Sequence, residues 1–141
     1  MNDRELDNWV DGQRSNVEQH LTQQGIDDPT VGPWPAFEIA PHFAIWPVES
    51  KTTPGDVGWW AFSGDCPTDH VKEDGPCHPR HALTNLLRKW RTCIPYLKKG
   101  EQPPESNFTG DTDMATLAEL LQTRVGILEE LHGDEKLWEN R

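Results

Sequence analysis

The sequence predicts an α+β fold in which a small antiparallel sheet of two to three strands packs against about three helices, in the order α-β-β-(β)-α-α. Apolar residues recur every three to four positions in the first 25 residues and again after residue 79, as on amphipathic helices. Between residues 33 and 64 the period changes to two, which indicates strands. Four of the seven tryptophans lie in that stretch, so we expect the core to form around it. The length of 141 residues fits one domain, and we expect residues 1–141 to form a single α+β domain.

The first helix is predicted over residues 3–24, where the apolar spacing is regular and Gly25 follows as a C-cap. His20 shares the apolar stripe of this helix with Leu21. We expect His20 to be a hydrogen-bonded residue at the boundary of the core rather than a ligand.

Three segments carry the strand pattern. They contain Phe37 and Ile39, then Phe43 and Ile45, and then the aromatic run from Gly58 to Phe62. Pro41 and Pro47 cannot donate to a strand ladder, so we expect edge strands or bulges at these two positions. The polar residues 49–56 are predicted to be the connection of a hairpin.

Residues 65–78 show little periodicity and contain two prolines, so they are predicted to form a long loop. Pro79 suits the first position of a helix whose apolar stripe runs from Leu83 to Leu97. Pro95 is expected to kink or end that helix, because the carbonyl of Arg91 loses its donor.

Residues 100–110 are predicted to be a linker, and a last helix follows it and ends at Gly133. Arg124 lies within the broad apolar arc of this helix. Because a lone buried guanidinium is costly, we expect a carboxylate from elsewhere in the fold to pair with it. Leu137 and Trp138 are predicted to dock the tail onto the rest of the protein.

The composition limits the class of partner. With 24 acidic and 13 basic side chains the formal net charge is −11, which favours basic partners and argues against nucleic acid. The first residues are polar and acidic, and no apolar run approaches the ~18 residues of a membrane span. Three cysteines are too few for a disulfide framework. We therefore expect a soluble, cytoplasmic protein without a membrane partner.

The densest group of reactive side chains lies in and just after the predicted loop. Cys66, His70, Cys77 and His78 are of the types that zinc prefers, but they lack the short paired spacing of structural zinc sites. We therefore expect no metal and no cofactor, and these four residues are the weaker alternative.

A second group is expected to converge at one end of the sheet: Asp65, Asp69, His78 and Arg80. The predicted loop leaves the aromatic strand at Gly64 and must return to begin a helix on the same sheet, so both of its ends are held close to it. The group would form an acid–base or anion site, and an internal Asp65–Arg80 pair is the favoured arrangement.

The aromatic strand also predicts a binding surface. Trp59 and Trp60 are adjacent, so they point to opposite faces of a strand and cannot both enter one core. We expect one of them to be available to a second layer or to a partner, with Asp65 and Arg80 as charged binding residues nearby.

Several segments together resemble a known family. They are Gly32-Pro33-Trp34-Pro35-Ala36-Phe37, residues 45–51, Gly58-Trp59-Trp60 leading to Asp69, and His78-Pro79-Arg80. They are similar to an uncharacterised family of small bacterial proteins catalogued as a domain of unknown function, over nearly the whole chain. The resemblance implies a bacterial, cytoplasmic, single-domain α+β protein. It implies no activity, cofactor or catalytic residue.

These observations favour a non-enzymatic binding or regulatory module that engages a basic protein partner, as an immunity protein or an adaptor does. The alternative is a small enzyme with an acid/base or anion site around Asp65, Asp69, His78 and Arg80, at the end of the strand over residues 59–62. A cleft that joins those four groups would favour the enzyme, whereas a flat acidic or aromatic face would favour the binding module.

Overall fold

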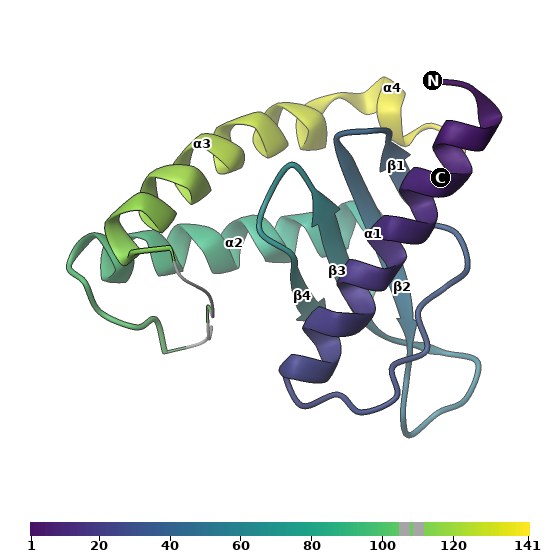
Figure 1. Ribbon diagram of the computed structural model, residues 1–141, viewed down its shortest axis with the longest axis horizontal. Coiled ribbons are helices and arrows are strands. Elements are labelled where there is room, and N and C mark those ends of the chain that lie inside the picture. The colour runs from purple at the N-terminus through teal and green to yellow at the C-terminus, as the bar shows by residue number, and fades with distance from the viewer. Residues whose placement is uncertain (105–107, 109–111) are drawn as a thin grey trace. The chain divides into compact units, whose positions relative to one another are not determined.

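The computed structural model describes residues 1–104, 108 and 112–141, and these fall into two compact units. Unit 1 comprises residues 1–82 together with Arg141, and unit 2 comprises residues 83–140 (Figure 1). The single domain that the sequence predicts stays a prediction. Of the predicted linker over residues 100–110, residues 105–107 and 109–110 lie outside the described residues.

Unit 1 contains a four-stranded antiparallel sheet. Its strands are β1 (Phe37–Ile39), β2 (Phe43–Glu49), β3 (Val57–Gly64) and β4 (Asp69–Lys72), in the spatial order β1-β2-β3-β4. The predicted α+β class and the first three strands are confirmed. The expectation of a loop over residues 65–78 is wrong for β4. This strand has only four residues, and it forms because it pairs with β3, from Phe62 opposite Asp69 to Trp59 opposite Lys72.

Pro47 lies inside β2, a central strand, at a position where its missing N–H does not interrupt the ladder with β3. Beyond Ile45, β2 no longer pairs with β1, and on that side it contacts the irregular segment over residues 30–32. The Gly32 N–H donates to the Pro47 carbonyl at 2.9 Å. The N and C=O of one residue point to the same side of a strand, so the missing donor of Pro47 faces this segment and not β3. Next to it, the ladder with β3 shifts register between Val48 and Glu49, as predicted for a bulge.

Helix α1 (Asp3–Gln23) lies across one face of the sheet, over β3 and β4 (Figure 1). Asn2 caps its N-terminus by accepting the Glu5 N–H at 2.8 Å. The contact between helix and sheet is a cluster of buried apolar residues: Val10, Val17, Leu21, Val31, Ala44, Trp46, Val48 and Ala61. Within it the Trp46 Nε1–H donates to the buried Ser63 hydroxyl at 3.1 Å. On the opposite face of the sheet, Phe43 stacks on Phe62 with 6.3 Å between ring centroids.

Three helices contribute to unit 2: α2 (Pro79–Lys98), whose first four residues belong to unit 1, α3 (Met114–Gly133) and α4 (Glu135–Trp138). Contacts between α2 and α3 show that they run antiparallel, with Thr84 beside His132 and Arg91 2.7 Å from Glu129. The predicted docking of the tail is confirmed, because Trp138 is buried and donates from Nε1 to the Leu131 carbonyl. Among the described residues, no helix combines the length and the apolar character needed to cross a bilayer.

Helix α2 continues through Pro95 for three more residues to Lys98, so of the two expected effects of Pro95, a kink or an end, the end is wrong. A proline in a helix removes one hydrogen bond, here that to the Arg91 carbonyl. Leu97 lies beyond Pro95 and is 1% exposed, so its burial favours another turn of helix.

Arg124 of α3 does not have the environment that the sequence predicts. It is half-buried, and its Nε is buried without a hydrogen-bond partner among the described residues. The expected carboxylate therefore does not satisfy this atom. An unpaired buried N–H reduces stability, whereas the aliphatic stem of the side chain contributes to packing.

We expect the substitution Arg124→Met to change the free energy of unfolding by less than about 1 kcal/mol, because methionine keeps the stem and removes the unpaired donor. Urea denaturation would measure this, with Arg91→Met as the control that removes an exposed ion pair. A loss of ~3 kcal/mol or more at Arg124 alone would show that a buried ion pair had been broken.

Candidate metal centre

Two histidines and an aspartate meet where α1 passes over the edge of the sheet. His20 lies in the last turn of α1, and Asp69 and His70 begin the edge strand β4. His70 pairs across the ladder with Ala61, which belongs to the apolar cluster beneath α1. This register places His70 on the face of the sheet that α1 covers, where it meets His20.

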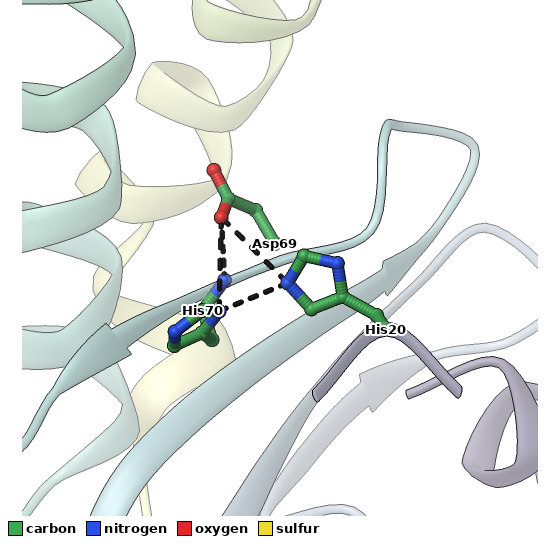
Figure 2. Close-up of side chains that lie close together, drawn as sticks. All are labelled: His20, Asp69 and His70. Atoms are coloured by element: carbon green, nitrogen blue, oxygen red, sulfur yellow. Dashed lines mark hydrogen bonds and ion pairs between the residues drawn. The ribbon is translucent and has the colours of Figure 1, made fainter. Parts of the chain in front are cut away.

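The three side chains approach one another, and each does so through one atom that could bind a metal ion (Figure 2). The Nε2 of His20 lies 2.9 Å from the Nδ1 of His70. One of these nitrogens therefore donates an N–H, and the other accepts the hydrogen bond. The Oδ1 of Asp69 lies 3.9 Å from the His20 Nε2 and 4.0 Å from the His70 Nδ1. The cluster therefore has two imidazole nitrogens and one carboxylate oxygen facing a common point.

Asp69 is the most buried member of the cluster. Its side chain is 5% exposed, compared with 16% for His20 and 19% for His70. Its Oδ1 accepts the backbone N–H of His70 at 2.8 Å, at the outer edge of the sheet. A buried carboxylate is costly unless hydrogen bonds or positive charge compensate it. The carboxylate is thus held in place by its own strand and directed at the two imidazoles, while the histidine rings remain partly open to solvent.

The three atoms are close enough together to bind one metal ion. A point inside the triangle of donor atoms lies about 2.1 Å from each of them, which matches zinc–nitrogen and zinc–oxygen bonds in proteins. Ligands bonded at that length are about 3.4 Å apart in a tetrahedron and about 3.0 Å apart at adjacent corners of an octahedron. The shortest separation, 2.9 Å, is close to the octahedral value and the other two exceed both values, so the separations alone do not select one coordination geometry. Two imidazole nitrogens with one carboxylate oxygen suit zinc and similar transition-metal ions better than magnesium, calcium or manganese, which prefer oxygen ligands.

Of the four residues expected to converge, only Asp69 belongs to this cluster. Asp65 is exposed and takes His42 as its partner, with 2.8 Å between Oδ2 and Nδ1, instead of the predicted Arg80. His78 donates from Nε2 to the Arg141 carbonyl at 2.7 Å and accepts the Arg80 backbone N–H at Nδ1. The predicted Asp65–Arg80 pair is therefore wrong, because Asp65 pairs with His42 of the β1–β2 turn.

Neither tryptophan of the Trp59–Trp60 pair is fully exposed, and a role of this pair in binding a partner stays a prediction. The two residues do lie on opposite faces of β3, as predicted, but Trp60 is 4% exposed and Trp59 is partly buried against the cluster beneath α1. The exposed tryptophan is Trp34, at 45%, in the proline-rich segment before β1. Both faces of the sheet are thus used for burial around this strand.

Of the weaker metal alternative, only His70 lies in the cluster. Cys66 is half-buried in the β3–β4 connection, and Cys77 is exposed. Although Cys77 is exposed, atoms around its sulfur remove part of its hydration, and this raises the pKa of the thiol. The negative charges of Glu73 and Asp56 raise the pKa further. A thiol with a raised pKa is a poor nucleophile and a poor ligand at neutral pH.

We expect the rate of Cys77 alkylation to reach half its maximum at a pH above that of a cysteine in a short peptide, about 8.5. The fraction of thiolate falls at any given pH when the pKa rises, so the profile moves to higher pH. Peptide mass spectrometry after iodoacetamide treatment would follow Cys77 separately from the other two cysteines. Glu73→Gln should move the profile back toward lower pH, and a wild-type midpoint at or below that of the peptide would contradict this assignment.

Sequence reasoning missed His20 as a site residue, although it predicted correctly that His20 makes a hydrogen bond at the boundary of the core. The signal that could have found it is the strand β4. Alternation along residues 69–72 places His70 with Ala61 on the helix-covered face, and an amphipathic helix then brings the histidine of its own apolar stripe to that face.

One family model covers nearly the whole chain. The family model described as Domain of unknown function (DUF4826) matches residues 3–138. The chain belongs to this family. The match includes every helix and strand of unit 1 as well as the three residues of the cluster. No curated protein and no solved structure gives a significant match.

Proposed function

We propose that the protein binds one divalent transition-metal ion, zinc in the first place, through His20, Asp69 and His70. The observation that carries this proposal is the single point about 2.1 Å from all three donor atoms. Two neutral imidazoles and one carboxylate give a site with a net charge of −1, so a divalent ion is favoured over a monovalent one.

Three protein ligands leave at least one coordination position for water or for an exchangeable ligand. Structural zinc sites usually have four protein ligands, whereas sites that exchange a ligand have three. The partial exposure of both histidine rings supports access to that position from solvent. The chemistry that zinc supplies in such a site is Lewis acidity toward the ligand in the open position.

Calorimetric titration of the chelator-treated full chain with zinc tests the proposal. We expect one zinc ion per chain, and a pink-to-blue tetrahedral absorption when cobalt replaces zinc. His20→Ala should lose both signals, whereas His42→Ala, which removes an exposed histidine of unit 1 outside the cluster, should retain them. Binding that is substoichiometric, or that the two variants lose equally, would contradict the proposal.

A second candidate, binding of a basic protein partner, is favoured by the distribution of charge. Unit 1 holds 14 of the 24 acidic residues but only 6 of the 13 lysines and arginines. Arg14 of α1 donates to the carbonyls of Val31 and Gly32, which holds the segment before the exposed Trp34 beside α1. Asp7 and Asp11 occupy the same flank of the helix as Arg14, so an exposed indole is supported beside an acidic helix face. Such a surface suits a lysine- or arginine-rich segment of a basic protein partner, which this protein would engage as an immunity protein or an adaptor does.

An arginine-rich peptide is a suitable probe for this second candidate. Fluorescence titration at physiological salt should show binding at least about tenfold weaker for Trp34→Ala, because the indole supplies a cation–π contact. Tyr96→Ala removes an exposed aromatic residue of unit 2 and should leave the affinity unchanged. Equal affinities in all three proteins would show adsorption by net charge alone and would reject a defined surface.

A further inference from the structure

The proposed metal ligands come from two elements that are distant in sequence. His20 belongs to α1, and His70 lies 50 residues later in β4. A helix that packs on a sheet shares no backbone ladder with it, so its contacts with the sheet are made by side chains. Near its middle, Arg14 binds the carbonyls of Val31 and Gly32, and near its C-terminal end His20 binds His70. The cluster is thus a point of attachment for the C-terminal half of α1.

The surface beneath this half of the helix is apolar. Val17 and Leu21 of α1 are fully buried against a sheet face that includes Trp46 and Ala61. Any opening of residues 14–23 away from the sheet exposes these side chains to water, and it also separates His20 from Asp69 and His70. An ion that needs all three ligands therefore binds only the closed arrangement.

We propose that the ion acts as a clamp that fixes the C-terminal half of α1 on the sheet, so that metal availability controls the exposure of the apolar sheet face beneath it. This inference rests on the proposed zinc binding. Without the ion, the polar attachment at this end includes a hydrogen bond between two imidazoles and the approach of Asp69 to His20. With the ion, three coordinate bonds join the helix to the edge strand.

The coupling between zinc binding and the closed state of α1 determines how strongly zinc suppresses the opening of the helix. A ligand that binds only the closed state lowers the population of the open state by a factor of about one plus the ratio of free ligand to its dissociation constant. Zinc at a hundred times its dissociation constant would lower the opening of α1 by about 100-fold. Opening elsewhere, for example in α3 of unit 2, does not separate the ligands and should be unaffected.

Hydrogen exchange measured by mass spectrometry on the full chain, with and without zinc, tests the clamp. We expect the amides of residues 14–23 to exchange at least about tenfold more slowly with zinc, and those of α3 to change little. His20→Ala should lose the zinc-dependent slowing, and His42→Ala should keep it. Each variant is compared with itself with and without zinc, so a change in its basal stability does not affect the comparison.

The outcomes separate this inference from the function on which it rests. Stoichiometric zinc binding without slower exchange in residues 14–23 would overturn the clamp and leave the metal site standing. Slowing of the same size in α3, or in His20→Ala, would also overturn the clamp. Failure of the wild-type chain to bind zinc would overturn the metal site and the clamp together.

Discussion

Asp69→Asn is expected to lower the affinity for zinc by at least about 100-fold while the protein stays folded. The amide keeps an oxygen that can accept the His70 backbone N–H, which the carboxylate accepts at 2.8 Å. It loses the negative charge that makes the carboxylate a good ligand for a divalent ion. The substitution therefore removes the contribution of Asp69 to metal binding and keeps its hydrogen bond at the start of β4.

Asp65→Asn is the matched control for this prediction. Asp65 lies four residues before Asp69 and also contacts a histidine, but it is exposed and outside the cluster. Zinc affinity by calorimetry should be unchanged in Asp65→Asn, and circular dichroism should show that both variants are folded. Equal affinity in Asp69→Asn and in the wild type would exclude the carboxylate as a ligand.

Gly64→Ala is expected to lower the free energy of unfolding by about 3–5 kcal/mol. Gly64 ends β3 with φ +122°, a conformation that alanine rarely adopts. A Cβ at this position would overlap the carbonyl oxygen of His42 and would lie 2.8 Å from the Phe43 Cα. These are backbone atoms of the neighbouring strand, and the His42 carbonyl also accepts the Asp65 N–H at 2.7 Å, so neither strand can shift without breaking the pairing.

Gly55→Ala provides the comparison. Gly55 also has a positive φ, +89°, but a Cβ there meets open space. Its substitution should cost only about 1 kcal/mol, from backbone strain without overlap. Chemical denaturation followed by tryptophan fluorescence would measure both variants. Equal losses at the two positions would show that the close approach of β2 and β3 at Gly64 contributes nothing.

The segments with strong local patterns were predictable from the sequence. Helix α1 extends over Asp3–Gln23, and the sequence predicts residues 3–24. The agreement is close because the apolar spacing persists for six turns and places the apolar side chains on one face. Strands β1 to β3 follow the alternation around Phe37, Ile45 and the Trp59–Trp60 pair. The family was also recognisable, because its segments carry rare residues such as tryptophan between prolines.

The candidate site depended on contacts that no local pattern encodes. Strand β4 is four residues long and is defined only by its ladder with β3, so the sequence alone left residues 69–72 in a loop. Once that ladder forms, His70 faces α1 and meets His20, a residue 50 positions earlier. The same long-range packing pairs Asp65 with His42 and buries Trp60. The helical and strand periods in the sequence indicate which face of an element is apolar. They therefore determined the type and position of most helices and strands of this protein. Which polar residues meet depends on register and on how the helix crosses the sheet, and only the tertiary structure decided that.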